Sequence, residues 1–371
     1  MICNSEKKGL YIHIPFCIRK CPYCDFYSVK ANEALIKRYE AAVIRNIGAY
    51  LEKDRSLCFD TIYFGGGTPS LLPAESVRNI LSAVGERMDG DSEVTLEMNP
   101  KTADAGYLNE LHSAGVNRLS IGVQSCIDSE LSGLGRLHSA SQALDTVAMA
   151  KQSGFENISC DLMIGIQGQN AGTMLESLEI LSGTGIQHIS AYMLKIEQGT
   201  PFYADKIYEI VPDEDETADM YLAMVDFLEK KDFKQYEISN FALKGFESRH
   251  NLKYWHCEEY VGIGAAAHSF YKGKRYAVPR DVEAFVNAEV QEEYVTEDKP
   301  ADFEERAMLQ LRLSEGLCPS DFPEHEHEIV KKAASLEKAG LLEISGGKIR
   351  LTPKGFLLSN TIIEKLILSN R

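Results

Sequence analysis

The stretch HIPFCIRKCPYCDFY, residues 13–27, carries three cysteines within eight positions, directly after a run that predicts a β-strand. Cys17, Cys21 and Cys24 stand in a C-x3-C-x2-C spacing, and Phe26 occupies the place two positions after the third cysteine. Three thiolates this close together can bind one metal centre. The spacing therefore predicts a metal site in the loop that follows the first strand.

Two metal centres fit the three thiols, and the residues alone leave both open. Zinc could take the cysteines together with His13 in a tetrahedral site. A [4Fe–4S] cluster could take the cysteines alone and leave one iron without a protein ligand, open to a small molecule. His13 lies inside the predicted strand and no second pair of zinc ligands is visible, so the cluster is the better fit. Three unrelated free thiols are the third interpretation.

Short apolar runs alternate with helical stretches over the first 200 residues. Such runs, each followed by an amphipathic segment, predict a parallel sheet covered by helices. Six units indicate an α/β fold with an incomplete (β/α)6 barrel, and a doubly wound sheet is the alternative. In a barrel the working residues lie at the carboxyl ends of the strands. The predicted strands are 9–16, 59–67, 93–100, 117–125, 157–165 and 188–196, and the helices between them include 73–88, 104–115 and 139–154.

The alternation fades after about residue 200, which predicts a change of architecture. A helix is expected at 211–233 and an extra strand at 235–242, and the acidic stretch 288–305 indicates a boundary. Helices at 305–314 and 326–339 precede a strand, a Gly-Gly turn, a second strand and a closing helix within 340–359, a winged-helix-like α+β pattern. We therefore expect a barrel domain at 1–290 and a smaller domain at 291–371.

The composition of the 371-residue chain is that of an ordinary globular protein. Hydrophobic residues make up 44% and the formal net charge is −16, which argues against a broad nucleic-acid surface. No secretory signal and no apolar run of membrane-spanning length is visible. We therefore expect a soluble, cytoplasmic protein, in which clustered thiols are metal ligands more often than disulfides.

The cysteine spacing, together with the glycine-rich strand end FGGGTPSLL at 64–72, resembles the radical S-adenosylmethionine (SAM) superfamily. That resemblance implies a [4Fe–4S] cluster on Cys17, Cys21 and Cys24, with SAM chelated at the open iron through its methionine end. It also implies reductive cleavage of SAM to a 5′-deoxyadenosyl radical. Glycines suit a ligand site because they let the backbone approach closely.

Further motifs narrow the resemblance to the group of oxygen-independent coproporphyrinogen III oxidases. These motifs are YIHIPFCIRKCPYCDF, LEMNP, RLSIGVQS, LGRLH and SCDLMIGIQGQ, and the likeness runs over nearly the whole chain, with Gln167 where the group more often has proline. By motif position, Tyr11, Gly66 and Glu97 are expected to touch the SAM at the cluster. The remaining nucleoside or a second SAM is expected to meet Tyr23, Gly67, Thr68, Gln124, Arg136 and Asp161.

Three features are more similar to the HemW heme chaperones of this group than to its dehydrogenases. Phe26 replaces the usual fourth cysteine, and only a short segment precedes Cys17. The stretch RHNLKYW at 249–255 carries an H-N-x-x-Y-W pattern that resembles the HemW heme motif. We expect His250 to be an exposed imidazole that ligates heme iron, because imidazole is a natural axial ligand.

Neighbours of this histidine also suit heme. Tyr254 and Trp255, the only tryptophan, can pack on a porphyrin face, and Arg249 can meet a propionate. Competing ligands in the same segment are His256, Cys257 and His268.

The resemblance implies a heme chaperone that holds a [4Fe–4S] cluster, SAM and heme and passes the heme to a hemoprotein, without coproporphyrinogen dehydrogenase activity. Radical SAM oxidative decarboxylation of coproporphyrinogen III is the alternative, and a nucleic-acid-modifying enzyme is the third reading. A flavodoxin or ferredoxin is the expected electron donor, and no nucleic-acid partner is expected. A homodimer and a peripheral membrane contact are left open.

Overall fold

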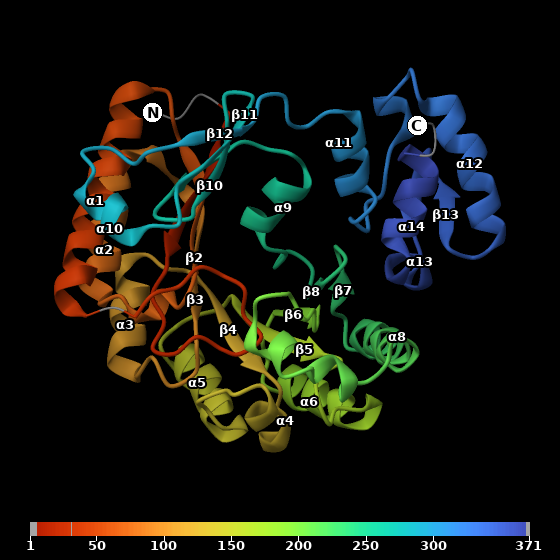
Figure 1. Ribbon diagram of the computed structural model, residues 1–371, viewed down its shortest axis with the longest axis horizontal. Helices are drawn as coiled ribbons and strands as arrows, with labels where there is room; N and C mark the ends of the chain where they lie inside the picture. Colours follow the sequence, from red (N-terminus) through yellow and green to blue (C-terminus); the bar gives the residue numbers. More distant parts are fainter. Residues whose placement is uncertain (1–5, 31, 369–371) are drawn as a thin grey trace.

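The computed structural model describes residues 6–30 and 32–368, and its first half is the parallel sheet that the alternating pattern predicts (Figure 1). Strands β1 to β6 follow one another in the sheet in chain order, and all pair in parallel. The predicted α/β architecture is therefore confirmed. The strands are β1 (Lys8–Ile14), β2 (Phe59–Gly66), β3 (Met88–Met98), β4 (Arg118–Gln124), β5 (Ile158–Ile164) and β6 (His188–Met193).

The two faces of this sheet differ in chemistry. On the outer face, apolar side chains such as Ile12, Phe64 and Ile121 are fully buried in the core. On the inner face, polar side chains such as Glu97 and Asp161 hydrogen-bond across the strands. Helices cover the outer face, so the inner face lines the lumen of a barrel, in contrast to a doubly wound sheet.

The covering helices begin and end at residues that stabilise helix termini. Ser139 and Gln142 form a capping box at the start of α5, and Gly115 ends α3 with a φ of 106°, a conformation that glycine adopts without strain. The predicted helices at 73–88, 104–115 and 139–154 are confirmed within a few residues. The helices are α1 (Glu33–Lys53), α2 (Ala74–Val84), α3 (Ala105–Ala114), α5 (Ala140–Gln152) and α6 (Ala171–Gly183).

Shorter helices occupy the connections and the region after β6. The helix expected at 211–233 is confirmed as α8 (Glu214–Lys230). The others are α4 (Asp128–Gly133), α7 (Pro201–Ala204), α9 (Arg249–Trp255) and α10 (Val282–Asn287).

Both edges of the six-stranded sheet are extended, to twelve strands in all among the described residues. Next to β1 lies β9 (Tyr260–Ile263), which is also parallel, followed by antiparallel β10 (His268–Tyr271), β11 (Lys274–Ala277) and β12 (Tyr294–Glu297). Next to β6 lie the antiparallel β8 (Asn240–Ala242) and β7 (Lys234–Gln235). The sequence reading did not anticipate the strand next to β1.

The single extra strand expected at 235–242 is wrong, because a turn divides it into β7 and β8. The buried Glu237 carboxylate accepts a hydrogen bond from the Ser239 backbone N–H at 3.0 Å and another from the Asn240 side chain. A carboxylate that takes two local donors favours a tight turn over a continuous strand.

The C-terminal part has the predicted order of helices and strands. Gly346 and Gly347, with φ values of 59° and 77°, form the turn between β13 (Leu342–Ser345) and β14 (Lys348–Leu351). The helices are α11 (Phe303–Gln310), α12 (Glu326–Lys338), α13 (Pro353–Leu357) and α14 (Ser359–Ile363).

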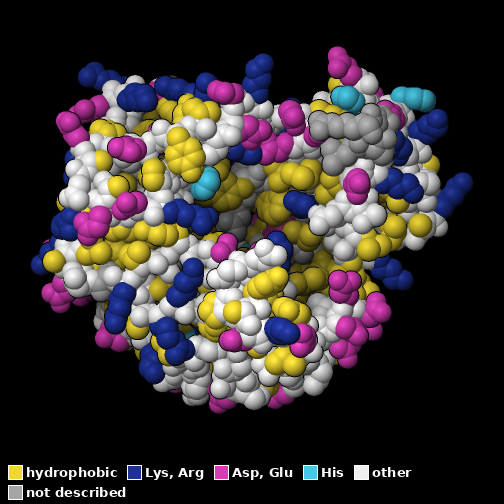
Figure 2. Space-filling view, viewed as in Figure 1, with side chains coloured by type: hydrophobic (Ala, Val, Ile, Leu, Met, Phe, Trp, Pro, Cys, Tyr) yellow, Lys and Arg dark blue, Asp and Glu magenta, His cyan; other side chains and the backbone are white. Residues whose placement is uncertain are grey.

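This part docks against the turn region between β7 and β8. An isolated bridge joins Glu237 to Leu313, and the Ser314 N–H donates to the Tyr236 carbonyl at 2.9 Å. Figure 2 shows a hollow with hydrophobic side chains on this face of the molecule. The domain boundary at residue 290 stays a prediction, and β12, which follows it, extends the large sheet.

No helix within 6–30 and 32–368 is long and apolar enough to cross a membrane.

Candidate functional site

The cysteine loop is closed at its neck by backbone hydrogen bonds. Phe16 and Val29 form an isolated bridge, the Cys17 N–H donates to the Val29 carbonyl at 3.1 Å, and the Val29 N–H donates to the Pro15 carbonyl at 2.7 Å. All three cysteines of the motif are half-buried. The loop is therefore anchored at the carboxyl end of β1 while its thiols remain accessible.

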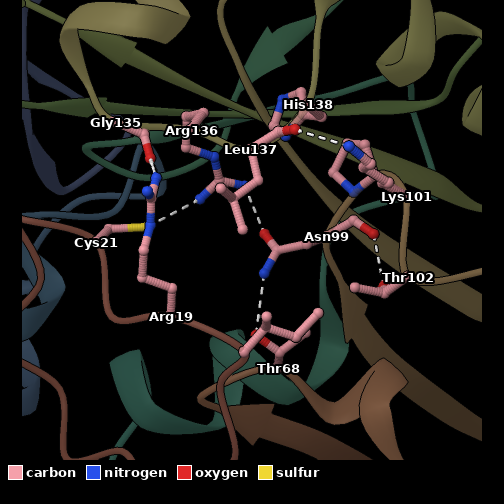
Figure 3. A pocket seen from close by; sticks show the side chains of 12 residues that line it. Arg19, Cys21, Thr68, Asn99, Lys101, Thr102, Gly135, Arg136, Leu137 and His138 are labelled. Carbon is pink, nitrogen blue, oxygen red and sulfur yellow. Dashed lines mark hydrogen bonds between the residues drawn. The ribbon is translucent and has the colours of Figure 1, made fainter.

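Two of the thiols touch residues that follow other strands. The Cys17 Sγ lies 3.6 Å from the Thr68 Oγ1, just after β2. The Cys21 Sγ accepts a hydrogen bond from Arg136 Nη1 at 3.6 Å (Figure 3). Burial raises the pKa of the Cys24 thiol. The loop thus folds over the strand ends, as the barrel prediction requires.

The residues around the loop offer no preformed zinc site. Among the residues that the structure describes, no group of three or more His, Cys, Asp or Glu side chains is placed to hold a single metal ion. The three thiols fit a [4Fe–4S] cluster by their number, since such a cluster puts each thiolate on a different iron. His13, the fourth zinc candidate, is buried with its Nδ1 3.0 Å from the Tyr11 hydroxyl.

The glycines at the end of β2 allow this strand to approach β1 and the start of the cysteine loop closely. A Cβ on Gly67 would lie 2.7 Å from the Phe16 carbonyl oxygen, and one on Gly66 would lie 2.6 Å from the His13 ring. Gly66 also has a φ of 115°, in the region that favours glycine. A larger residue at either place would push the end of β2 away from β1 and the residues that lead into the cysteine loop.

Glu97, on β3, is held beside the glycine-containing end of β2. Its carboxylate accepts hydrogen bonds from the Gly66 N–H at 3.1 Å and from the Tyr63 hydroxyl at 2.8 Å. Burial raises the pKa of Glu97 to about 7. A carboxylate in this position can take the ammonium group of a ligand. Sequence reasoning missed Tyr63, although the period of two along β2 places it on the inner face with Thr61 and Gly65.

A second group of polar residues meets above β4. Arg136 donates to Asn99, to the Gly122 carbonyl at 2.8 Å and to the Tyr23 hydroxyl at 3.2 Å. The Asn99 amide in turn donates to Thr68 Oγ1 at 3.0 Å. The network therefore joins the cysteine loop to the ends of β2, β3 and β4.

This network borders a pocket that is open to solvent (Figure 3). Cys21, Thr68, Asn99 and Arg136 line it together with Lys101. Gln124, with a φ of 70°, ends β4 close by, since a Cβ on Gly122 would lie 3.0 Å from its Nε2.

Asp161 stands apart from this group, on β5. It accepts a hydrogen bond from the Ser120 hydroxyl at 3.0 Å, and burial raises its pKa to about 6. The structure thus joins Arg136 to Tyr23 directly and to Thr68 through Asn99, and it joins Gly66 to Glu97. Asp161 faces the same lumen from β5.

His250 is not the exposed imidazole that the sequence analysis expected. Its side chain is fully buried, with Nδ1 2.8 Å from the Thr61 Oγ1 and Nε2 2.7 Å from the Tyr254 hydroxyl. Burial lowers the pKa of His250 to about 3, so the ring is neutral. The expectation of exposure is wrong because α9 packs this side chain into the barrel lumen.

The other candidates near His250 are more accessible. Arg249 is half-exposed, donates to the Asp91 carbonyl at 2.7 Å and lies 3.7 Å from Asp60. Partly exposed His256 has its Nε2 3.9 Å from Glu315, and His268 is exposed.

Family comparisons agree with this geometry. The family model described as "Radical SAM superfamily" matches residues 11–181, and "HemN C-terminal domain" matches residues 298–358. "Heme chaperone HemW" of Lactococcus lactis is 35% identical over 379 positions, covering 99% of each chain. The protein of the same name from Escherichia coli is 32% identical, covering 96% of this chain and 97% of its own.

The fold matches a solved structure over almost its whole length. Coproporphyrinogen III oxidase (HemN) from E. coli, described as a radical SAM enzyme, superimposes with a TM-score of 0.81 and covers 98% of this chain and 91% of its own. At 19% identity this likeness establishes the fold alone. With two full-length relatives above 30% identity, the chain belongs to the HemW family of the radical SAM superfamily.

Proposed function

We propose that this protein is a heme chaperone that carries a [4Fe–4S] cluster, binds SAM and heme, and delivers heme to a hemoprotein. The observation that carries the proposal is the full-length similarity to relatives named heme chaperones, which includes both family regions. The position of Phe26, where the dehydrogenases usually have a fourth cysteine, agrees with it.

The cysteine loop is the proposed cluster site. Cys17, Cys21 and Cys24 would each hold one iron, and the cluster would supply an electron to SAM chelated at the fourth iron. Arg136, which donates to the Cys21 sulfur, would stabilise a bound thiolate because hydrogen bonds to sulfur tune such a cluster.

The lumen beside the loop is the proposed SAM site. Glu97, oriented by Gly66 and Tyr63, would accept the SAM ammonium group, and Asp161 would accept hydrogen bonds from ribose hydroxyls. Tyr11, Gly67 and Gln124 would contribute to the same site, as the resemblance implies.

Heme ligation is proposed for the segment from 249 to 270. His250 remains the ligand that the motif implies, but it can reach iron only after its bonds to Thr61 and Tyr254 break. His268 and His256 reach solvent without such a change. The proposal includes a heme-receiving hemoprotein and, in the cytoplasm, a flavodoxin or ferredoxin as the one-electron donor.

The test uses the anaerobically reconstituted full chain with SAM, a reductant and coproporphyrinogen III, followed by heme transfer to an apo-hemoprotein. We expect no protoporphyrinogen, and we expect heme to move to the acceptor faster than from free solution. Heme titrations of His250→Ala, His256→Ala and His268→Ala identify the ligand. Turnover to protoporphyrinogen, or no heme binding by the wild type, would replace the chaperone proposal with the dehydrogenase one.

A further inference from the structure

The buried histidine of α9 belongs to a column of aromatic rings inside the barrel. The His250 ring stacks on the Tyr63 ring with centroids 5.1 Å apart and an interplanar angle of 27°. Tyr63 in turn stacks on Tyr11 at 6.2 Å and 28°. Packed rings restrict each other's rotation, so the orientation of Tyr63 depends on the histidine beneath it.

The barrel holds His250 in this place from several sides. Its backbone N–H donates to the Glu93 carboxylate at 3.0 Å, in addition to the two ring hydrogen bonds. A Cβ on Gly9 would lie 3.1 Å from the His250 Cε1, so the absence of a side chain there leaves room for the ring. A ring that is fixed this closely can act as a rigid support.

Tyr63 connects this support to the proposed methionine end of SAM. Its hydroxyl donates to one oxygen of Glu97 at 2.8 Å, and the other oxygen accepts from the Gly66 N–H at 3.1 Å. Both carboxylate oxygens are thereby oriented. If Tyr63 rotates, the Glu97 oxygen Oε1 loses its donor, and only the bond from the Gly66 N–H to the other oxygen remains.

We infer that His250 is a positioning residue for SAM, which acts through Tyr63 to orient Glu97 toward the methionine ammonium group. This role rests on the proposed SAM site and requires no heme. It gives the histidine of the H-N-x-x-Y-W motif a function in the heme-free protein, where both of its ring nitrogens are occupied.

The experiment measures ligand affinity by equilibrium dialysis on the full chain with its reconstituted cluster, without heme. The probes are methionine, SAM and 5′-methylthioadenosine, which has the nucleoside but no amino-acid group. Tyr63→Phe should raise the dissociation constants of methionine and SAM about tenfold, the effect of losing one hydrogen bond to a charged group. His250→Gln should raise them about threefold or more, with 5′-methylthioadenosine within twofold of wild type.

Tyr254→Phe provides a milder variant in case His250→Gln does not fold. It removes only the hydroxyl that holds the His250 Nε2 and preserves the packing of the ring. We expect it to weaken methionine binding about two- to threefold. Circular dichroism and bound iron should equal those of the wild type in every variant.

The chain offers a matched control in a second buried histidine. His188 is also fully buried, with Nδ1 2.7 Å from the Ser159 hydroxyl and Nε2 2.8 Å from the Tyr236 hydroxyl. The Ser159 hydroxyl lies 3.3 Å from the Ser190 hydroxyl, and Ser190 in turn hydrogen-bonds to Asp161. His188→Gln and Tyr236→Phe should therefore leave methionine affinity within twofold of wild type.

Three results would each overturn this inference alone. The first is an equal loss of affinity for all three probes, and the second is an equal loss of methionine affinity in the control variants His188→Gln and Tyr236→Phe. The third is unchanged methionine affinity in Tyr63→Phe and His250→Gln. Wild-type protein that holds its cluster but binds no SAM would instead overturn the proposed function.

Discussion

The cysteine loop and the barrel lumen lie side by side but are stabilised to different degrees. The loop is tied at its neck and by single hydrogen bonds further along, from the Phe202 N–H to the Pro22 carbonyl at 3.1 Å and from Arg136 to the Tyr23 hydroxyl at 3.2 Å. Its cysteines are half-buried, and two of its thiols have their nearest polar partners at 3.6 Å. In the lumen, buried carboxylates and rings hold one another at 2.7–3.1 Å. The lumen is therefore organised before any ligand arrives, whereas the loop depends on a metal centre to complete it.

The largest expected effect falls on the loop. Replacing Cys17, Cys21 and Cys24 together with alanine should abolish iron and sulfide incorporation, because no thiolate is left to hold a cluster. The metal-free variant should unfold at the same temperature as the metal-free wild type, within about 2 °C, since the thiols contribute little packing.

Chemical iron analysis and thermal melts check both statements. Cys318→Ala, a half-buried thiol in the C-terminal part, serves as the control and should retain its iron. A large drop in the metal-free melting temperature would show that the loop is as rigidly packed as the lumen.

A smaller effect is expected from the charge of Glu97 in the lumen. Its pKa of about 7 means that the carboxyl is protonated below that pH and ionised above it. Only the ionised form attracts an ammonium group, so SAM affinity should rise about tenfold between about pH 6 and pH 8. Glu97→Gln should bind SAM more weakly and remove most of this pH dependence. If SAM affinity changes with pH in Glu97→Gln as steeply as in the wild type, the titration belongs to another group.

Stability in acid should depend on the buried histidines. Burial lowers the folded-state pKa of His188 and His250 below the unfolded value of about 6.5. The unfolded chain then binds more protons, so stability is lost as the pH falls below about 6.5. Between about pH 6.5 and pH 5 His250, with a folded-state pKa of about 3, should contribute about 2 kcal/mol of this loss, and His188 should act in the same direction.

Urea unfolding at several pH values tests the acid effect. His188→Gln should flatten the decline of the unfolding free energy, while His327→Gln, at an exposed position, should leave it unchanged. If the unfolding free energies of the wild type and His188→Gln fall in parallel as the pH is lowered, the lumen is open to water in acid.

The smallest effect is expected for Phe26→Cys. The Phe26 side chain is 68% exposed, and three cysteines already suffice for a cluster with one open iron. Iron content and SAM affinity should match the wild type, and coproporphyrinogen III should remain unconverted. Appearance of protoporphyrinogen would make the fourth cysteine the feature that separates the two branches of the group.

The sequence was sufficient to predict the cysteine loop but only partly sufficient to predict the barrel lumen. The loop was predicted from local signals, which are the spacing of Cys17, Cys21 and Cys24, the glycine run at 65–67, and the alternation of strands and helices. These signals depend on neighbours in the chain, so the strands β1 to β6 and the Gly-Gly hairpin were predicted correctly.

The lumen depends on partners far apart in sequence. His250 is buried because Thr61 and Glu93 bind it and Gly9 makes room for it, and none of these residues lies near it in the chain. An H-N-x-x-Y-W pattern on a short helix gives no local sign of that burial. Strand β9 was missed for a related reason, since four residues that pair with distant β1 carry too little periodicity.

The occupied ring nitrogens of His250 also set a thermodynamic condition on any heme complex that uses this residue. Iron that takes Nε2 must displace the Tyr254 hydroxyl and draw the ring from its stack on Tyr63. Heme would then loosen SAM, and by reciprocity SAM would loosen heme by the same factor. A carrier built in this way would release its cargo when the second ligand arrives, without any contact between the two molecules.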